Sequence, residues 1–175
     1  MTGEITFTPT EQDYADANRD WYRAALSGRR GLIRLAIPIL FVIILGGFFS
    51  WLDGDVAALP YMLVVYALLG LAVIVLVHGT CYLSLPRRAR RLFRQQKSLH
   101  HPLRFHWSDE GITSEAVNGS GRHDWGDFHR WHDGRKTFLL FLNDRLFLFL
   151  PRHRLSDAEA NDLRSRVSAA GVPRF

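Results

Sequence analysis

Histidine and aspartate side chains gather in one short stretch of the sequence, and both can bind zinc or iron. The stretch contains His123, Asp124, Asp127, His129, His132 and Asp133. Residues three apart on a strand point to opposite faces of a sheet, so His129 and His132 would diverge if this segment is extended. We therefore expect no metal site and no cofactor here.

Other signatures of catalysis are missing from the sequence. It has neither a glycine-rich phosphate loop nor a GxSxG nucleophile motif. Its one cysteine, Cys81, falls at the edge of a long apolar segment and leaves no intramolecular disulfide to form. These features argue against an enzyme. A metal-dependent enzyme that uses the histidine-rich stretch is the weakest of the functional alternatives.

A cluster of cations is a second candidate site. Residues 31–101 hold seven Lys or Arg against two acids, which accounts for the whole net charge of +5. The rest of the chain is nearly neutral, so we expect no nucleic-acid partner. Six of the cations follow an apolar segment and are candidates to contact anionic lipid at about 1 kcal/mol each: Arg87, Arg88, Arg90, Arg91, Arg94 and Lys97. They could instead serve only to fix membrane topology on a solvated helix.

The cations flank two long apolar segments. Residues 35–52 contain no charged side chain, and residues 56–86 contain only a few polar ones, among them His78. At about 1.5 Å per residue, each segment is long enough to cross a hydrocarbon core of about 30 Å as a helix. The alternative is two buried helices of a soluble core, but nothing else in the chain could cover so much apolar surface.

The turn between these segments has Asp53 and Asp55 and no cation. Because cations are retained on the cytoplasmic side during insertion, the turn should be external and both termini cytoplasmic. The chain is thus expected to be a multi-pass membrane protein. Gly46, Gly47 and Gly70 would let the two spans approach closely. His78 could have a structural role or a role in transport.

The segments outside the spans show patterns of strands and helices. Within residues 1–30, Ile5 and Phe7 indicate a short strand, and Thr10 precedes a helix expected over 11–28. A lone strand needs a partner, and residues 102–175 are the only candidate. Residues 87–101 are expected to form a basic juxtamembrane helix or linker. The apolar side chains of Leu85, Ala89, Leu92 and Phe93 would share one face of this helix as it continues from the second apolar segment.

Residues 102–175 indicate short strands separated by turns, with a hairpin at "NGSG" and extended segments "RHDW" and "DFHRWH". The runs "TFLLFL" and "LFLFLP" are apolar on both faces, so each face needs a cover. A final helix is expected from Ser156, with Glu159 in a capping box and a packing stripe of Ala160, Leu163, Val167 and Ala170. The expected fold class is a two-helix membrane hairpin with a small cytoplasmic α+β domain.

Three quoted stretches resemble the YcxB-like membrane proteins of bacteria: "FHWSDEGITSE", "DWGDFHRWHDGRKTFLLFL" and "LFLFLPRHRLSDAEANDLRSRV". The resemblance rests on the "DEG" turn, on Trp125 with Phe128 and Trp131, and on the Leu150-Pro151-Arg152 end of a strand. It implies a protein of a bacterial inner membrane whose cytoplasmic domain is pleckstrin-homology-like, an antiparallel sheet or partial barrel. Arg152 stands where the family often has Lys. The resemblance supplies no catalytic or binding residues.

The function that these observations favour is a non-enzymatic binding or scaffolding module at the inner leaflet. Lys136, Arg152 and Arg154, close in sequence to Arg135, are the candidate contacts for an anionic ligand on the rim of the domain. The main alternative is an accessory subunit of a transporter or envelope complex, with His78 and the glycine-bearing spans at the interface. Expected partners are the lipid bilayer and either another protein or a second copy of the chain.

Overall fold

The computed structural model describes residues 3–52, 54 and 59–175, without the side chains of residues 29 and 30. It divides into two compact units. The sheet unit comprises residues 1–24 and 85–175, and the hairpin unit comprises residues 25–84. The acidic turn predicted at Asp53 and Asp55 lies outside the described residues, as do the side chains of Arg29 and Arg30.

The sheet unit contains two antiparallel sheets. The first has the strand order β1 (Gly3–Phe7), β2 (Leu103–Trp107), β3 (Gly111–Ala116) and β4 (Gly119–Asp124). The second has the order β5 (Arg130–Asp133), β6 (Thr137–Phe141) and β7 (Phe147–Pro151). Short 3-10 turns, η2 (Lys97–His100), η3 (Trp125–Asp127) and η4 (Arg152–Arg154), connect these elements, and helix α4 (Asp157–Ala169) follows. The predicted small antiparallel-sheet domain with a C-terminal helix is confirmed.

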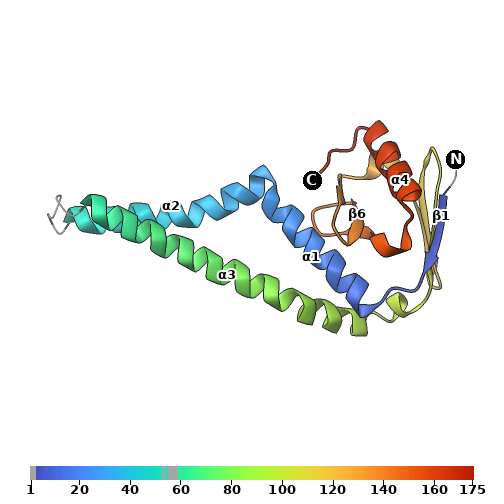
Figure 1. Cartoon of the computed structure of the whole chain (residues 1–175), viewed down its shortest axis with the longest axis horizontal. Helices are drawn as coiled ribbons and strands as arrows, with labels where there is room; N and C mark the ends of the chain where they lie inside the picture. The colour runs from blue at the N-terminus through green and yellow to red at the C-terminus, as the bar shows by residue number, and fades with distance from the viewer. Residues whose placement is uncertain (1–2, 53, 55–58) are drawn as a thin grey trace. The chain divides into compact units, whose positions relative to one another are not determined.

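Strands β1 and β2 are neighbours in the first sheet although some ninety-five residues separate them in the chain (Figure 1). Ile5 pairs with Phe105, and Phe7 at the end of β1 pairs with Leu103 at the start of β2. The predicted pairing of the N-terminal strand with the C-terminal part is therefore confirmed. The three helices that the structure describes between residues 11 and 95 are inserted in the sequence between β1 and β2, which are adjacent strands. The chain therefore leaves this sheet and returns to it at the same edge.

The core of the sheet unit lies between its two sheets and helix α4. All five residues of β6 are buried, because its two faces are both covered, as the apolar pattern of that strand requires. Helix α4 begins with the predicted capping box, in which Ser156 and Glu159 bond to each other's backbone N–H groups. Ala160, Leu163 and Val167 are fully buried. The predicted inclusion of Ala170 in this stripe is wrong, because the helix ends before it and its side chain is exposed.

The segment around Trp125 also differs from the prediction. It was expected to be extended on both sides of Gly126, but β4 ends at Asp124 and residues 125–127 form the turn η3. The Asp124 backbone N–H donates to the Asp127 carboxylate at 3.2 Å, which caps this turn. Trp125 is buried, and its indole N–H donates to the Ser108 carbonyl at 2.9 Å. Local capping and burial of the indole thus outweigh the strand pattern.

Helix α1 (Glu11–Ser27) begins where Thr10 predicts. The Asp13 backbone N–H donates to the Thr10 hydroxyl at 3.1 Å, and the Thr10 N–H donates to the Asp13 carboxylate at 3.0 Å. The face of α1 that packs on the sheets carries small or acidic residues, because Ala17 and Asp20 are both buried. Its first fourteen residues belong to the sheet unit, and its last three belong to the hairpin unit.

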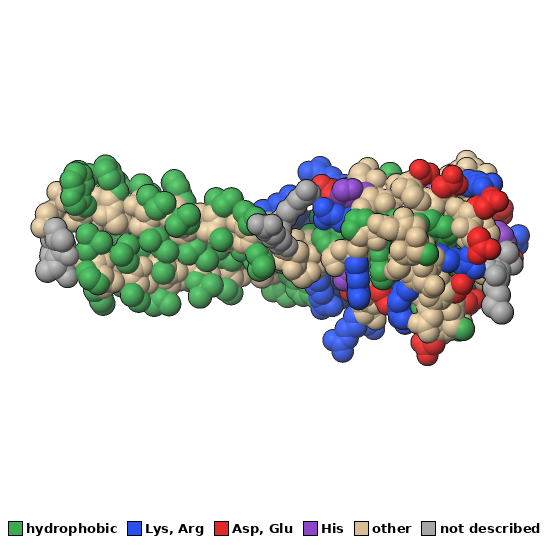
Figure 2. All heavy atoms as spheres, turned by 90° about the horizontal axis from the view of Figure 1, so that it is seen from above, with side chains coloured by type: hydrophobic (Ala, Val, Ile, Leu, Met, Phe, Trp, Pro, Cys, Tyr) green, Lys and Arg blue, Asp and Glu red, His purple; other side chains and the backbone are tan. Residues whose placement is uncertain are grey.

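The hairpin unit consists of α2 (Arg29–Leu52) and most of α3 (Leu59–Gln95). Both helices are long and apolar enough to cross a membrane, and only 6% of the most apolar stretch of each is buried within the described protein. The alternative of two buried core helices is therefore wrong. Figure 2 shows apolar side chains covering the surface of this unit, whereas charged side chains gather on the sheet unit.

Glycines lie where α2 and α3 pack against each other, as their positions predict. A Cβ atom on Gly46 would come within 2.1 Å of the Tyr66 ring, so only glycine fits there. A Cβ atom on Gly70 would meet the Ile39 backbone at 3.4 Å, and one on Gly47 would meet Leu63 at 3.5 Å. Close approach of the two backbones at these points maximises van der Waals contact between helices in an apolar surrounding.

Candidate functional site

The first candidate site is the basic end of α3. The helix continues without a break to Gln95, and all six predicted lipid-contacting cations, Arg87, Arg88, Arg90, Arg91, Arg94 and Lys97, are exposed. Ala89 and Phe93 on the opposite side are buried, and the Phe93 ring lies 6.2 Å from the Tyr14 ring of α1. Most of the predicted apolar face therefore packs on protein. Only Leu92 of that face is largely exposed.

Two of these arginines also contact α1. Arg94 bonds to Glu11 with an Nε to Oε1 distance of 2.7 Å, and Arg90 donates to the Gln12 side chain at 3.3 Å. The hydrogen bond from Arg94 lowers the pKa of the Glu11 carboxyl. Four cations remain, and their side chains make no hydrogen bond or ion pair within the described part of the chain: Arg87, Arg88, Arg91 and Lys97. They are the cations still available to an outside partner.

The second candidate site is a cleft of about 750 Å³ in the sheet unit, which we call the α1 cleft. It brings together side chains from α1, from the turn between β5 and β6, and from η4. The residues that line it are Gln12, Asp13, Asp16, Arg19, Asp20, Arg23, Arg135, Lys136, Arg152 and His153. Lys136 and Arg152, two of the predicted rim cations, therefore meet in one cleft. The third, Arg154, is exposed and does not line it.

Asp20 fixes the turn that carries the cations of this cleft. Its Oδ2 atom accepts hydrogen bonds from the backbone N–H of Lys136 at 2.9 Å and of Thr137 at 3.0 Å, and from the Thr137 hydroxyl at 3.0 Å. A Cβ atom on Gly134 would lie 2.4 Å from the same oxygen, so glycine is required for this approach. A buried charge is tolerated where hydrogen-bond donors surround it.

Arg152 lies at the other side of the α1 cleft. Its backbone N–H donates to the Lys136 carbonyl at 2.8 Å, which joins the two cation-bearing segments. Its side chain is 23% exposed and lies 3.7 Å from Asp133 and 3.9 Å from Asp157, so both contacts are longer than hydrogen bonds. Asp133 bonds instead to Arg164 of α4. The Arg152 guanidinium thus keeps unused hydrogen-bonding capacity.

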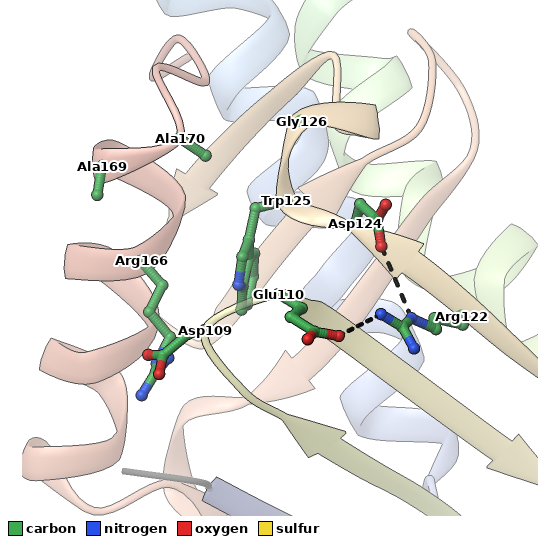
Figure 3. A pocket seen from close by; sticks show the side chains of 9 residues that line it. All are labelled: Asp109, Glu110, Arg122, Asp124, Trp125, Gly126, Arg166, Ala169 and Ala170. Carbon is green, nitrogen blue, oxygen red and sulfur yellow. Dashed lines mark hydrogen bonds and ion pairs between the residues drawn. The ribbon is translucent and has the colours of Figure 1, made fainter.

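A second cleft of the sheet unit, with a volume of about 650 Å³, lies beside Trp125 (Figure 3). In Figure 3, Arg122 extends between Glu110 and Asp124, and its nitrogens lie 2.5 Å and 3.7 Å from their carboxylates. Arg166 pairs with Asp109 and with Asp162. Both arginines of this cleft are therefore already neutralised by carboxylates of the protein.

Three histidines of the histidine-rich stretch, His123, His129 and His132, lie in different surroundings. His123 packs on the Phe128 ring, and His129 lies 3.7 Å from Asp144. His132 is half-buried in β5, where burial lowers its pKa. Among the described residues, no group of three or more His, Cys, Asp or Glu side chains is arranged to hold a metal ion. His78 is half-buried on α3, and the choice between its structural and transport roles stays open.

Comparison with known families bears on the sheet unit. Residues 107–165 match the family model described as YcxB-like protein. These residues form a YcxB-like domain. The domain runs from the end of β2 into α4 and includes Trp125, Trp131 and the Leu150-Pro151-Arg152 segment, which confirms the predicted resemblance. No curated protein and no solved structure matches the chain significantly.

The YcxB-like domain contains Lys136 and Arg152 of the α1 cleft, whereas the α1 residues of the cleft precede it in the chain. Sequence reasoning missed Asp20. The signal was present in the spacing of Ala17, Asp20 and Ala24, which places an acid within a helix face of small residues. An acid in such a stripe indicates a buried carboxylate with a specific partner.

Proposed function

We propose that this chain is a multi-pass protein of a bacterial inner membrane, in which α2 and α3 cross the bilayer and hold the YcxB-like domain at the cytoplasmic face. The observation that carries the proposal is the uncovered apolar surface of the hairpin unit. In water, an exposed surface of this extent would drive aggregation, whereas in lipid it is the expected exterior.

The pairing of β1 with β2 supports the placement of both termini on one side. Phe7 and Leu103 are direct partners in an antiparallel pair, so the two ends of the helical insertion start within a few ångströms of each other. A hairpin that leaves and returns at one sheet edge crosses a membrane an even number of times. This argument is independent of charge.

The charges support a cytoplasmic location for that side. The exposed cations at the end of α3 are part of the sheet unit, whereas Asp53 and Asp55 lie in the sequence between α2 and α3. At about 1.5 Å per residue, α3 is roughly 55 Å long, so its basic end extends beyond a hydrocarbon core of about 30 Å. Cations retained in the cytoplasm then give the orientation.

Within this arrangement, the sheet unit is a pleckstrin-homology-like module that binds a partner at the inner leaflet without catalysing a reaction. A four-stranded and a three-stranded antiparallel sheet with a C-terminal helix support that fold. The α1 cleft supports a binding role, because it gathers cations from three separate segments. One of these segments is the turn that Asp20 holds in place.

Single-cysteine labelling tests the membrane arrangement. In a Cys81→Ser background, Asp55→Cys should react with an impermeant maleimide in intact spheroplasts, and Ser168→Cys on the exposed side of α4 should react only after permeabilisation. Labelling of Ser168→Cys in intact spheroplasts, or release of the chain by alkaline extraction, would refute the proposal.

Site-specific photo-crosslinking in native membranes tests the binding role. A photoreactive residue in place of Lys136, in the α1 cleft, should give discrete adducts. A photoreactive residue in place of Leu40, on the exposed face of α2, is the matched control. Adducts from Leu40 alone would favour an accessory subunit of a membrane complex over a binding module.

A further inference from the structure

We propose that the α1 cleft binds a phosphoryl group, carried either by a lipid headgroup or by a soluble phosphorylated molecule. This inference rests on the proposed binding role and names its class of ligand. Five Lys or Arg line the cleft against three Asp: Arg19, Arg23, Arg135, Lys136 and Arg152 against Asp13, Asp16 and Asp20.

The carboxylates of the cleft are engaged by the protein itself. Asp20 accepts three hydrogen bonds from Lys136 and Thr137. Asp13 accepts from the Thr10 backbone N–H and hydroxyl at the start of α1. Asp16 accepts from the Gln12 side chain at 3.0 Å and lies 3.6 Å from Arg19. These acids have local structural partners and do not neutralise the cations on the turn.

Arg135 and Lys136 are the cations left for a ligand. Both side chains are exposed, and neither makes a hydrogen bond or ion pair within the described ranges. They are consecutive residues on the turn that Asp20 and Gly134 hold in place. Because the backbone is already fixed, binding would not carry the additional cost of ordering the turn.

Arg152 supplies a third cation from a different segment. Its backbone is bonded to Lys136, and its guanidinium lies beyond hydrogen-bond distance from both nearby carboxylates. A guanidinium fork and an ammonium from two adjoining segments match the several oxygens of a phosphoryl group. The cleft beside Trp125 differs, because each of its two arginines already makes a hydrogen bond to a carboxylate.

The test uses the full chain in nanodiscs and two probes. Inorganic pyrophosphate is titrated into protein in phosphatidylcholine nanodiscs, with affinity measured by calorimetry. Separately, the thermal midpoint is compared between phosphatidylcholine nanodiscs and nanodiscs that also contain phosphatidic acid. The test variant is Arg135→Gln with Lys136→Gln. The control is Arg104→Gln with Arg145→Gln, which removes the same charge from exposed side chains of the sheet unit outside the cleft.

We expect the test variant to lose affinity about tenfold or more, since a charge-assisted hydrogen bond contributes roughly 1.5–3 kcal/mol. The control should stay within about twofold of the wild type, because its cations lie outside the cleft. If the test variant loses affinity for pyrophosphate, the ligand is a soluble phosphorylated molecule. If the test variant loses only the stabilisation by phosphatidic acid, the ligand is a lipid headgroup. Both results support the proposal.

The inference is overturned if neither probe binds the wild type, or if both variants lose binding equally, since net charge alone would then explain the effect. The inference is also overturned if the test variant keeps both its affinity for pyrophosphate and its stabilisation by phosphatidic acid, whatever the control variant does. These outcomes leave the labelling and crosslinking results unchanged, so a failure here differs from a failure of the proposed function.

Discussion

The two units of this protein treat the same kinds of side chain in opposite ways. In the sheet unit, Phe138 and Leu140 are fully buried. In the hairpin unit, Phe41 is 63% exposed and Leu68 is 61% exposed. One chain in one solvent would not arrange its large apolar side chains both ways, because exposure of each costs about 1.5–3 kcal/mol in water. This is the difference expected if lipid surrounds the hairpin unit, as proposed, and water surrounds the sheet unit.

Charges follow the same contrast. The sheet unit accommodates Asp20 in its interior because three donors surround one of its oxygens. The stretch of α2 from residue 35 to its end at Leu52 carries no charge on any face. In the bilayer that we propose around α2, an unpaired charge would be costly because lipid chains donate no hydrogen bond to it.

A charge on the exposed face of α3 should have the largest effect. Leu68→Asp should disfavour the membrane-inserted state by about 3–4 kcal/mol, because an acid at the centre of a span costs that much in lipid. The fraction of protein that resists alkaline extraction measures the effect. Val117→Asp is the matched control, because Val117 is 66% exposed on the hairpin of the sheet unit and faces water. Equal tolerance of both changes would contradict a lipid surrounding.

Removal of the buried carboxylate of the sheet unit should come next. Asp20→Ala should destabilise the protein by about 3 kcal/mol, because the buried N–H of Thr137 and its hydroxyl lose their acceptor. The thermal midpoint in nanodiscs measures this. Asp16→Ala removes a more exposed carboxylate of the same helix. It should lower the free energy of unfolding by less than about 0.5 kcal/mol. A similar midpoint for both variants would show that the turn does not depend on Asp20.

The helix contact within the hairpin unit should show an intermediate effect. Gly46→Leu should cost about 2 kcal/mol, because its side chain would collide with the Tyr66 ring. Gly79→Leu is the control, since a Cβ atom there meets nothing within 4 Å. Thermal unfolding of the full chain, followed by helical circular dichroism, compares the two. If Gly79→Leu proves the more damaging change, the packing of α2 on α3 is not as described.

The smallest effect concerns acid pH and the sheet unit alone. Burial lowers the pKa of His132 below its ordinary value of 6.5, with Arg174 acting in the same direction against Asp20 and Asp133. The unfolded chain then binds more protons than the folded one between the lowered pKa and about 6.5. Stability is therefore fully present above pH 6.5 and falls as the pH decreases through this window.

The fall in thermal midpoint between pH 7.5 and pH 5.5 should be smaller in His132→Gln than in the wild type. The exposed His101 provides the control, and His101→Gln should leave the fall unchanged. An unchanged fall in His132→Gln would show that other groups cause the pH dependence.

Several features were predictable from the sequence because they depend on near neighbours in the chain. The capping of α4 by Ser156 and Glu159 spans three residues, and the β3–β4 hairpin follows from the "NGSG" turn, where Gly119 has a φ of +146°. The predictions that Ala170 packs as part of α4 and that residues 125–127 are extended were wrong. A periodic pattern does not show where a helix ends or where an indole finds a hydrogen-bond acceptor.

The position of the two long apolar helices could be predicted from the sequence alone, because each corresponds to an uninterrupted apolar run of about twenty residues. Only the tertiary structure decided that Phe7 lies beside Leu103, and that Asp20 of α1 holds the turn at Lys136 against Arg152. The physical reason is the distance along the chain. Local propensity acts over a few residues, whereas these contacts join segments that only the packing of the whole unit brings together.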